Sequence, residues 1–482
     1  MGVLTGLEPK KVFEYFEEIC KIPHGSSDTR RISDFCVDFA IKHGFKHIQD
    51  SLNNVIIFKD GTKGYEQSKP IIIQGHMDMV CEKEPDCNID FKEDGLELSL
   101  SGGIISANGT TLGGDDAIAL AYALAILDSD DIPHPPLEVV FTVDEEIGML
   151  GAAGMDCSPL KSKTMLNIDS EEEGYLLVSC AGGVTAVCHI GCEWEIKEGV
   201  LADITVSGLI GGHSGVEIDK QRANACKVLG RILYGLKNRA AYGLVSVNGG
   251  LKDNAIPRMA QASLLIDRKD EAVIKEYLSD IGRILSDEYK SDDRDINVDI
   301  SIGGEKELPV MKDNVKDRVI AALVTLPDGV QRMSSDIEGL VQTSLNLGIL
   351  STDEKEVSMS FSVRSSVGTK KDELVDKMKC LMDSLGGNVT LSGDYPAWEY
   401  KENSKLKDLM IQVFEEQTGR KPVVQALHAG VECGLFAGKI EGLDCVSFGP
   451  DIKDIHTTAE CMDAESVKRT WEYLLEILKR LK

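Results

Sequence analysis

Hydrophobic residues recur at two spacings along the first 180 residues, and these spacings predict helices that alternate with short strands. Val12, Phe13, Phe16 and Ile19 follow Pro9 at the spacing of one helical face. Further helices are predicted over 28–43 and 111–127, and buried strands over 55–58, 71–73, 137–143 and 165–168. This alternation is typical of an α/β fold with a mostly parallel central sheet.

The pattern changes near residue 181 and returns near residue 397. The intervening segment has longer alternating strands and two long amphipathic helices, predicted near 271–289 and 370–384. We therefore predict a discontinuous α/β domain of residues 1–180 and 397–482, interrupted by an inserted α+β domain of residues 181–396.

The predicted inserted domain contains a weak internal repeat. The run Ser246-Val-Asn-Gly-Gly resembles Ser344-Leu-Asn-Leu-Gly, and Leu265-Ile-Asp-Arg resembles Phe361-Ser-Val-Arg. Chance similarity between strands would explain the match, and so would a duplicated α+β unit. We favour the duplication.

Composition and charge restrict the class of protein. The 482 residues include 80 acidic and 52 basic ones, which gives a formal net charge of −28. Such a chain lacks the cationic surface that nucleic acids and anionic membranes require. No apolar run reaches the length of a membrane-spanning helix, and the first residues do not form a signal peptide. The 13 scattered cysteines indicate reduced thiols, so we expect a cytoplasmic protein.

Acidic and histidine residues cluster where predicted strands end. Each cluster alone has an ordinary explanation, because acids cap helices and fill solvated turns. Together they place two histidines and several carboxylates on loops of the α/β part: His76 with Asp78, Asp115 with Asp116, Asp144-Glu145-Glu146, Asp169, and Asp454 with His456. Loops after parallel strands form sites in such folds. This mixture of imidazole and carboxylate suits a pair of zinc, manganese or cobalt ions.

The ordered motifs resemble a known family nearly from end to end. The runs are ICKIPH at 19–24, GHMDMV at 75–80, TTLGGDD at 110–116, DEEIGMLGA at 144–152, NIDSE at 167–171 and HAGVECG at 428–434. The chain is similar to the co-catalytic zinc aminoacylase, carboxypeptidase and dipeptidase superfamily. It most resembles the aminoacyl-histidine dipeptidases (PepD-type, Xaa-His dipeptidases), which implies a zinc-exopeptidase-like catalytic domain with an inserted lid.

The resemblance implies roles for individual residues. The implied metal ligands are His76, Asp115, Glu146, Asp169 and His456. It implies that Glu145 is the general base and that Asp78 orients His76. Relatives often show Ala-Asp-Asn-Gly where this chain has Gly-Asp115-Asp116-Ala, so either aspartate could bridge the metals. We choose Asp115.

In the lid, the resemblance implies that His213 polarises the scissile carbonyl and that Asn254 and Arg364 hold the substrate carboxylate. A planar guanidinium suits that task. The implied activity is hydrolysis of short peptides, including Xaa-His or β-alanyl-histidine dipeptides, with two divalent ions, zinc or else manganese or cobalt. A related tripeptidase, an N-acyl amino acid deacylase and a non-enzymatic acidic metal-binding protein remain alternatives. We also expect a homodimer.

Overall fold

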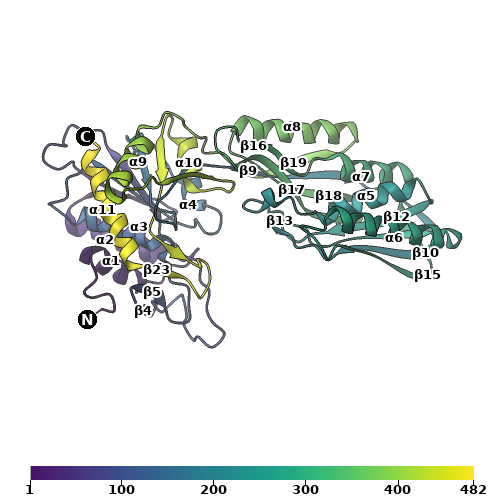
Figure 1. Ribbon diagram of the computed structural model, residues 1–482, viewed down its shortest axis with the longest axis horizontal. Helices are drawn as coiled ribbons and strands as arrows, with labels where there is room; N and C mark the ends of the chain where they lie inside the picture. The colour runs from purple at the N-terminus through teal and green to yellow at the C-terminus, as the bar shows by residue number, and fades with distance from the viewer. Residues whose placement is uncertain (1) are drawn as a thin grey trace. The chain divides into compact units, whose positions relative to one another are not determined.

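The computed structural model describes residues 2–482, which divide into two compact units. Unit 1 comprises residues 2–180, 400–426 and 431–482, and unit 2 comprises residues 181–399 and 427–430. The first and last helices therefore belong to the same unit, as the purple and yellow ribbons in Figure 1 show. Among the described residues, no helix is long and apolar enough to span a membrane. All 13 cysteines are free thiols.

Unit 1 is built on an eight-stranded sheet. In spatial order its strands are β1 (Lys46–Gln49), β2 (Val55–Lys59), β6 (Leu137–Thr142), β3 (Ile71–His76), β7 (Thr164–Asn167), β21 (Asp444–Ser447), β8 (Tyr175–Cys180) and β20 (Val423–Leu427). The four central strands, β6 to β21, run parallel to one another, while β1, β2 and β8 pair antiparallel. The predicted α/β class with a mostly parallel centre is confirmed.

Helices cover this sheet, and every residue of β3 and β6 is buried. Burial on both faces explains why these strands are mostly apolar in the sequence and do not alternate apolar with polar residues. The helices are α1 (Lys10–Cys20), α2 (Arg30–His43), α3 (Gly114–Leu127), α4 (Leu150–Gly154), α9 (Lys405–Thr418), α10 (Glu432–Lys439) and α11 (Ala464–Arg480). A small second sheet contains β22 (Ile452–Lys453), β23 (Cys461–Asp463), β5 (Ile104–Ala107) and β4 (Leu98–Ser101).

The apolar helix α3 lies directly against β3. A Cβ atom on Gly75 would come within 2.5 Å of the Ala119 Cβ atom, so only glycine allows this approach. The helix begins later than the predicted residue 111, and its first turn is irregular. Gly113 has a left-handed backbone, and Asp115 and Asp116 have non-helical torsions. The regular helix therefore starts after both aspartates. Their side chains do not have to point in the directions that a helical backbone would impose.

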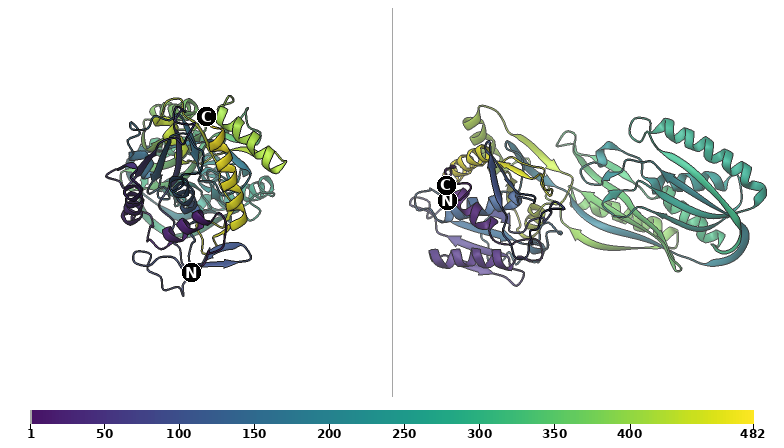
Figure 2. Two further views of the ribbon diagram at one scale, coloured as in Figure 1. Left: turned by 90° about the vertical axis from the view of Figure 1, so that its left-hand side faces the viewer. Right: turned by 90° about the horizontal axis from the view of Figure 1, so that it is seen from below.

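Unit 2 is a nine-stranded antiparallel sheet with helices packed on it. Along the sheet the strands are β15 (Asn297–Met311), β10 (Trp194–Ser207), β14 (Ala260–Ile266), β12 (Tyr242–Gly249), β17 (Val341–Thr352), β18 (Glu356–Ser365), β9 (Gly182–Gly191) and β19 (Asn388–Tyr395), with β16 (Gly329–Met333) beside β17. Alternate residues of β18 are buried, as expected for a sheet covered on one face. The second view in Figure 2 shows the helices gathered on one side of these strands.

Four helices form that layer, whereas the sequence pattern predicted two. They are α5 (Ala225–Lys237), α6 (Glu271–Glu288), α7 (Asp313–Thr325) and α8 (Gly368–Ser384). The prediction missed α5 and α7. Glycine lowers helix propensity in α5, but Gly230 is required because a Cβ atom there would lie 2.7 Å from the Leu323 Cβ atom of α7. Close packing between the two helices therefore requires a glycine in α5, and this glycine weakens the helix signal in the sequence.

The elements of unit 2 occur in a repeated order. The series α5, β12, β14, α6 and β15 is followed by α7, β17, β18, α8 and β19. The sheet is symmetrical about the β12–β17 pair, since β14, β10 and β15 on one side correspond to β18, β9 and β19 on the other. This symmetry agrees with the sequence similarity around Ser246 and Ser344, and the duplication itself stays a prediction.

Candidate metal centre

Three neighbouring parallel strands of unit 1 end at one edge of the sheet. His76 is the last residue of β3 and lies opposite Thr142, the last residue of β6, and Gln74 lies opposite Asn167 of β7. The segments that follow carry Asp78, Glu145 and Asp169. The carboxyl ends of parallel strands are where open α/β sheets place their sites. The fold thus brings three of the predicted clusters together.

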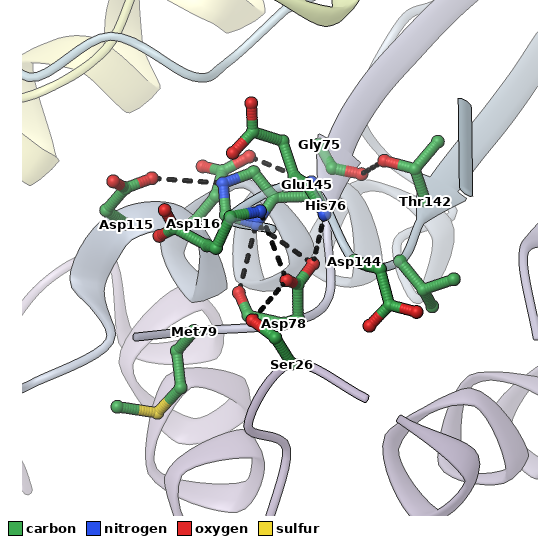
Figure 3. Close-up of polar contacts among 12 residues, drawn as sticks. Ser26, Gly75, His76, Asp78, Met79, Asp115, Asp116, Thr142, Asp144 and Glu145 are labelled. Carbon is green, nitrogen blue, oxygen red and sulfur yellow. Dashed lines mark hydrogen bonds and ion pairs between the residues drawn. The ribbon is translucent and has the colours of Figure 1, made fainter. Parts of the chain in front are cut away.

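Asp115 lies between the two histidines of the predicted site. Its Oδ1 atom is 3.1 Å from the His76 Nε2 atom, and its Oδ2 atom is 3.3 Å from the His456 Nε2 atom. The contact with His76 is drawn in Figure 3. One carboxylate therefore faces two imidazoles through different oxygens, which is the placement that a carboxylate bridging two ions requires.

Glu146 and Asp169 complete the two sides of this arrangement. The Glu146 Oε1 atom is 3.0 Å from the His456 Nε2 atom, and the Asp169 Oδ1 atom is 3.7 Å from the His76 Nε2 atom. Donor atoms close enough to share an ion form three groups: His76, Asp116 and Asp169; His76, Glu145 and Glu146; and Asp115, Glu146 and His456. All five predicted metal ligands therefore lie in one cluster of unit 1.

Asp116, the neighbour of Asp115, has a different set of contacts. Its Oδ2 atom accepts the backbone N–H of His76 at 3.1 Å. This hydrogen bond fixes the end of β3 to the start of α3. Asp116 shares a possible donor group with His76 and Asp169, but only Asp115 contacts both histidines among the described residues.

Sharp turns of the backbone present these side chains. Asp144, Asp454 and His456 all have left-handed backbone torsions, with φ of 54°, 54° and 63°. Residues other than glycine rarely adopt this conformation, and where they do, the surrounding structure must stabilise it. One such turn directly precedes Glu145 and Glu146, and the other contains the half-exposed His456.

The Nδ1 side of His76 faces Asp78, whose backbone carbonyl and carboxylate both lie close to it. Its Nδ1 atom donates to the Asp78 carbonyl oxygen at 2.9 Å, whereas the Asp78 Oδ1 atom is 3.6 Å away. Asp78 lies beyond β3, which ends at His76. A proton on Nδ1 leaves the Nε2 lone pair free to face the carboxylates, which is the tautomer that a metal ligand needs.

The Asp78 carboxylate holds the loop after β6. It accepts the backbone N–H groups of Glu145 and Glu146 at 3.0 and 3.3 Å, and the Ser26 hydroxyl at 2.8 Å. The bonds from Ser26 and Glu145 are visible in Figure 3. Asp78 is buried, and within residues 2–482 its carboxylate forms an ion pair only with the His76 imidazole. Its contacts therefore fix the position of the predicted general base.

The cluster contains an excess of negative charge. Six carboxyl groups surround two imidazoles: Asp78, Asp115, Asp116, Glu145, Glu146 and Asp169. Burial raises the pKa of Glu145 to about 9, with Asp169 adding to the effect and His76 opposing it. Hydrogen bonds to Asp115 and Glu146 raise the pKa of His456 to about 10. Buried carboxylates in such excess are unfavourable unless cations compensate them, so the donor set fits divalent ions.

The predicted substrate-binding residues lie in unit 2. His213 belongs to β11 (Gly212–His213), which pairs with β13 (Ala255–Ile256). The His213 Nδ1 atom accepts the backbone N–H groups of Gly215 and Val216 at 3.2 and 3.3 Å. Since Nδ1 is an acceptor, the proton of the neutral ring lies on Nε2. Burial, followed by the charge of Arg364, lowers the pKa of His213 and favours this neutral form.

Asn254 and Arg364 are held by separate contacts. The Asn254 carbonyl accepts the Ser214 N–H at 2.9 Å, which links it to the His213 segment. Arg364 lies opposite Ser344 in the β17–β18 pair and donates from Nη1 to the Tyr395 hydroxyl at 3.0 Å. Its buried Nε atom has no hydrogen-bond partner within residues 2–482. Arg364 therefore retains a donor for a further acceptor.

Three residues with clear structural roles were not assigned one from the sequence. The His428 Nε2 atom is 2.7 Å from the Ser344 hydroxyl, and burial lowers the pKa of His428 to about 3, with Arg364 contributing. Glu432 is buried and accepts hydrogen bonds from side chains of β3 and β6. Glu460 accepts three backbone N–H groups at the start of α3. The first two belong to the HAGVECG run, which was noted only as a resemblance. Nothing in the local pattern distinguishes Glu460 from a surface acid.

Comparisons with known proteins show the family to which the chain belongs. The model of peptidase family M20/M25/M40 matches residues 72–480. The chain is 35% identical to the cytosol non-specific dipeptidase of Escherichia coli, over 100% of this chain and 99% of the relative. The structure of an aminoacylhistidine dipeptidase from Vibrio alginolyticus superposes with a TM-score of 0.91 at 34% identity, covering 99% and 98% of the two chains. A tripeptidase from Staphylococcus aureus shares the fold, with a TM-score of 0.56, 16% identity and 100% and 99% coverage.

Proposed function

This chain belongs to peptidase family M20/M25/M40, and from that premise we propose that it is a dipeptidase that works with two divalent metal ions. The observation that carries the proposal is the position of Asp115, whose two oxygens face His76 and His456 separately. A carboxylate so placed can be shared by two ions. An aspartate that only caps a helix or fills a solvated turn would not require two imidazoles beside its carboxylate.

We assign the ligands according to their neighbours in the cluster. His76 and Asp169 would hold one ion and Glu146 and His456 the other, with Asp115 bridging them. Asp116 is the alternative bridge that the sequence left open. Its Oδ2 atom is already engaged by the His76 N–H, so we assign it to positioning β3.

Bound ions would supply Lewis-acid activation of water and of the scissile carbonyl. Glu145 is the base that takes a proton from water and delivers it to the leaving amine. The Asp78 carboxylate accepts the Glu145 backbone N–H, and this hydrogen bond holds Glu145 in place for the two proton transfers.

We propose that unit 2, which the sequence predicted as an inserted domain of residues 181–396, acts as the lid. There the His213 Nε2–H would donate a hydrogen bond to the carbonyl oxygen as negative charge develops on it. The free Arg364 donor and the Asn254 side chain would bind the carboxylate end of the peptide. Residues 1–180 and 397–482 would form the catalytic domain.

The finer features of the proposal follow from the resemblance and from the relatives. Substrates are short peptides, with Xaa-His and β-alanyl-histidine dipeptides to be tested first. Zinc is the first metal to test, with manganese and cobalt as alternatives, since imidazole and carboxylate ligands suit all three. We also propose a cytoplasmic location and a homodimer, which fractionation and sedimentation velocity test directly.

Metal analysis combined with a peptide assay tests the proposal. The purified protein should bind two ions per chain, lose activity with a chelator and regain it with zinc or manganese. The substrate panel should contain dipeptides, tripeptides and N-blocked amino acids, because a tripeptidase or a deacylase would prefer the latter two. Binding of two ions without hydrolysis of any member would contradict the proposed activity.

A further inference from the structure

A fully buried glutamate lies beneath the candidate metal centre and is not used by the proposed mechanism. Glu432 is the first residue of α10 and has no exposed surface. Its Oε2 atom accepts the Gln74 Nε2–H at 2.6 Å and the Thr142 hydroxyl at 2.7 Å. Burial of a carboxyl group destabilises the fold unless hydrogen bonds, an ion pair or protonation compensate for the lost hydration.

The contacts of Glu432 extend into a network across three strands. Gln74 is on β3, Thr142 on β6 and Asn167 on β7. The Gln74 Oε1 atom accepts the Asn167 Nδ2–H at 2.6 Å, and the Gln74 Nε2 atom also lies 3.2 Å from the Thr142 hydroxyl. All four side chains are buried. Residues 358 positions apart in the sequence are thus joined beneath the site.

Each strand in the network delivers one residue of the candidate site. Gln74 precedes His76 by two residues, Asn167 precedes Asp169 by two, and Thr142 precedes Glu145 by three. Side chains two residues apart on a strand project to the same face, and the strand ends carry the ligands and the base. A shift of one strand against another would therefore change the distances among these groups.

Two buried oxygens of this network lack partners within the described chain. They are the Glu432 Oε1 atom and the Asn167 Oδ1 atom, and no ion pair includes Glu432 in residues 2–482. A proton on Oε1 would convert one of the two unpaired acceptors into a donor. Burial raises the pKa of Glu432 to about 7, with His76 opposing and Asp169 and Asp78 adding to the rise. Burial and the neighbouring carboxylates favour the uncharged acid, while the hydrogen bond from the Thr142 hydroxyl opposes it.

We propose that Glu432 is a positioning residue of the metal centre, which as an uncharged, hydrogen-bonded acid holds β3, β6 and β7 in register. It contacts no residue that we assign as a metal ligand, so it acts through the strands. This inference rests on the proposed two-metal function. Its consequence is that the hydrogen-bonding capacity of the side chain matters and its negative charge does not.

Substitutions at Glu432 separate these two properties. Glutamine keeps an acceptor for Gln74 and Thr142 and supplies a donor in place of the acid proton, so E432Q should stay within about threefold of wild type in kcat and in zinc affinity. Methionine has a similar shape but no hydrogen-bonding pair, so E432M should lose at least about tenfold in both, the scale seen when groups supporting metal ligands are removed. Zinc affinity of the metal-free protein is measured by calorimetry with a competing chelator.

Glu138 provides a matched control on the same sheet. It is buried at the opposite end of β6, where it accepts the backbone N–H groups of Lys161 and Ser162. E138M should lower the unfolding temperature as E432M does, but it should leave zinc affinity and kcat within about threefold of wild type. If E432M does not fold, T142V decides, since it removes one donor to Oε2 without a change in size and should reduce zinc affinity by at least about tenfold, well beyond the threefold allowed for E138M.

The outcomes are distinct. Wild-type zinc affinity and kcat in E432M, or in T142V where E432M fails to fold, would overturn the inference. So would a loss in E432Q as large as that in E432M, because a charged carboxylate would then be required. An inactive wild-type protein that binds no zinc would instead refute the proposed function itself.

Discussion

Glu460 stabilises the segment that leads into Asp115, and its removal has a calculable effect. The carboxylate is 3% exposed, and it accepts the backbone N–H groups of Leu112, Gly113 and Gly114 at 2.9, 3.1 and 2.8 Å. These groups precede the first regular turn of α3 and have no helical partner. The loop that presents Asp115 therefore depends on one side chain 345 positions away.

Glu460→Ala leaves three buried N–H groups without an acceptor. Each such group costs about 1–3 kcal/mol, so we expect a loss of at least about 3 kcal/mol in the free energy of unfolding. That loss corresponds to a fall of about 6–12 °C in the unfolding temperature of a domain of roughly this size. Glu460→Gln keeps the oxygen that serves Leu112 and Gly113 and loses only the bond from Gly114, so it should cost about one third as much.

Calorimetry of the metal-free protein measures the stability change, and hydrogen exchange of residues 112–114 measures the local effect. Glu441→Ala, a substitution at an exposed glutamate, should change the stability by less than about 0.5 kcal/mol. Because the loop carries Asp115, Glu460→Ala should also weaken zinc binding by about tenfold or more. A loss below 1 kcal/mol, or equal losses in the alanine and glutamine variants, would refute the reasoning.

Four further predictions follow from the site and from unit 2. Glu145→Ala should retain two ions per chain by elemental analysis but lose at least about 100-fold in kcat, since a positioned base contributes about that much; unchanged turnover would remove Glu145 as the base. His456→Ala should bind about one ion, and full retention of two would contradict its assignment. Arg364→Lys should raise KM about tenfold for a dipeptide with a free carboxylate, with little change for its amide, because lysine lacks the planar fork. Burial lowers the pKa of His428 to about 3, so the unfolded chain takes up a proton near pH 6.5 while the folded chain does not. Stability should fall as the pH drops from 6.5 towards 3, and His428→Asn should reduce that fall by about 1–3 kcal/mol in urea titrations; identical pH slopes would exclude this contribution.

The central strands could be predicted from local patterns because their burial on both faces selects apolar residues at most positions. The runs that became β3, β6 and β7 are mostly apolar, as strands covered on both faces usually are. The same reasoning missed α5, where Gly230 satisfies a close contact with Leu323 that no local pattern reveals. Propensity describes a residue's own backbone, whereas packing between helices depends on a partner distant in the sequence.

The candidate ligands were named from the sequence, since the order of His76, Asp115, Glu146, Asp169 and His456 resembles a family pattern. The structure brings them together, and their role as ligands stays a prediction. The sequence left open which of two adjacent aspartates lies between the histidines. The resemblance implied that Asp78 orients His76, and the structure adds a hydrogen bond from the His76 Nδ1 atom to the Asp78 backbone carbonyl that the sequence did not indicate. Both points depend on backbone torsions at the end of β3 and the start of α3, which spacing alone does not define.

The sequence by itself therefore determined the kinds of groups in this protein: apolar strands, two imidazoles, an excess of carboxylates and the family to which the chain belongs. Only the tertiary structure decided their partners. Asp115 lies between two histidines, Glu432 joins three strands, and Glu460 holds the loop before α3. Hydrogen bonds act over about 3 Å, so contacts between residues hundreds of positions apart exist only once folding has brought them together.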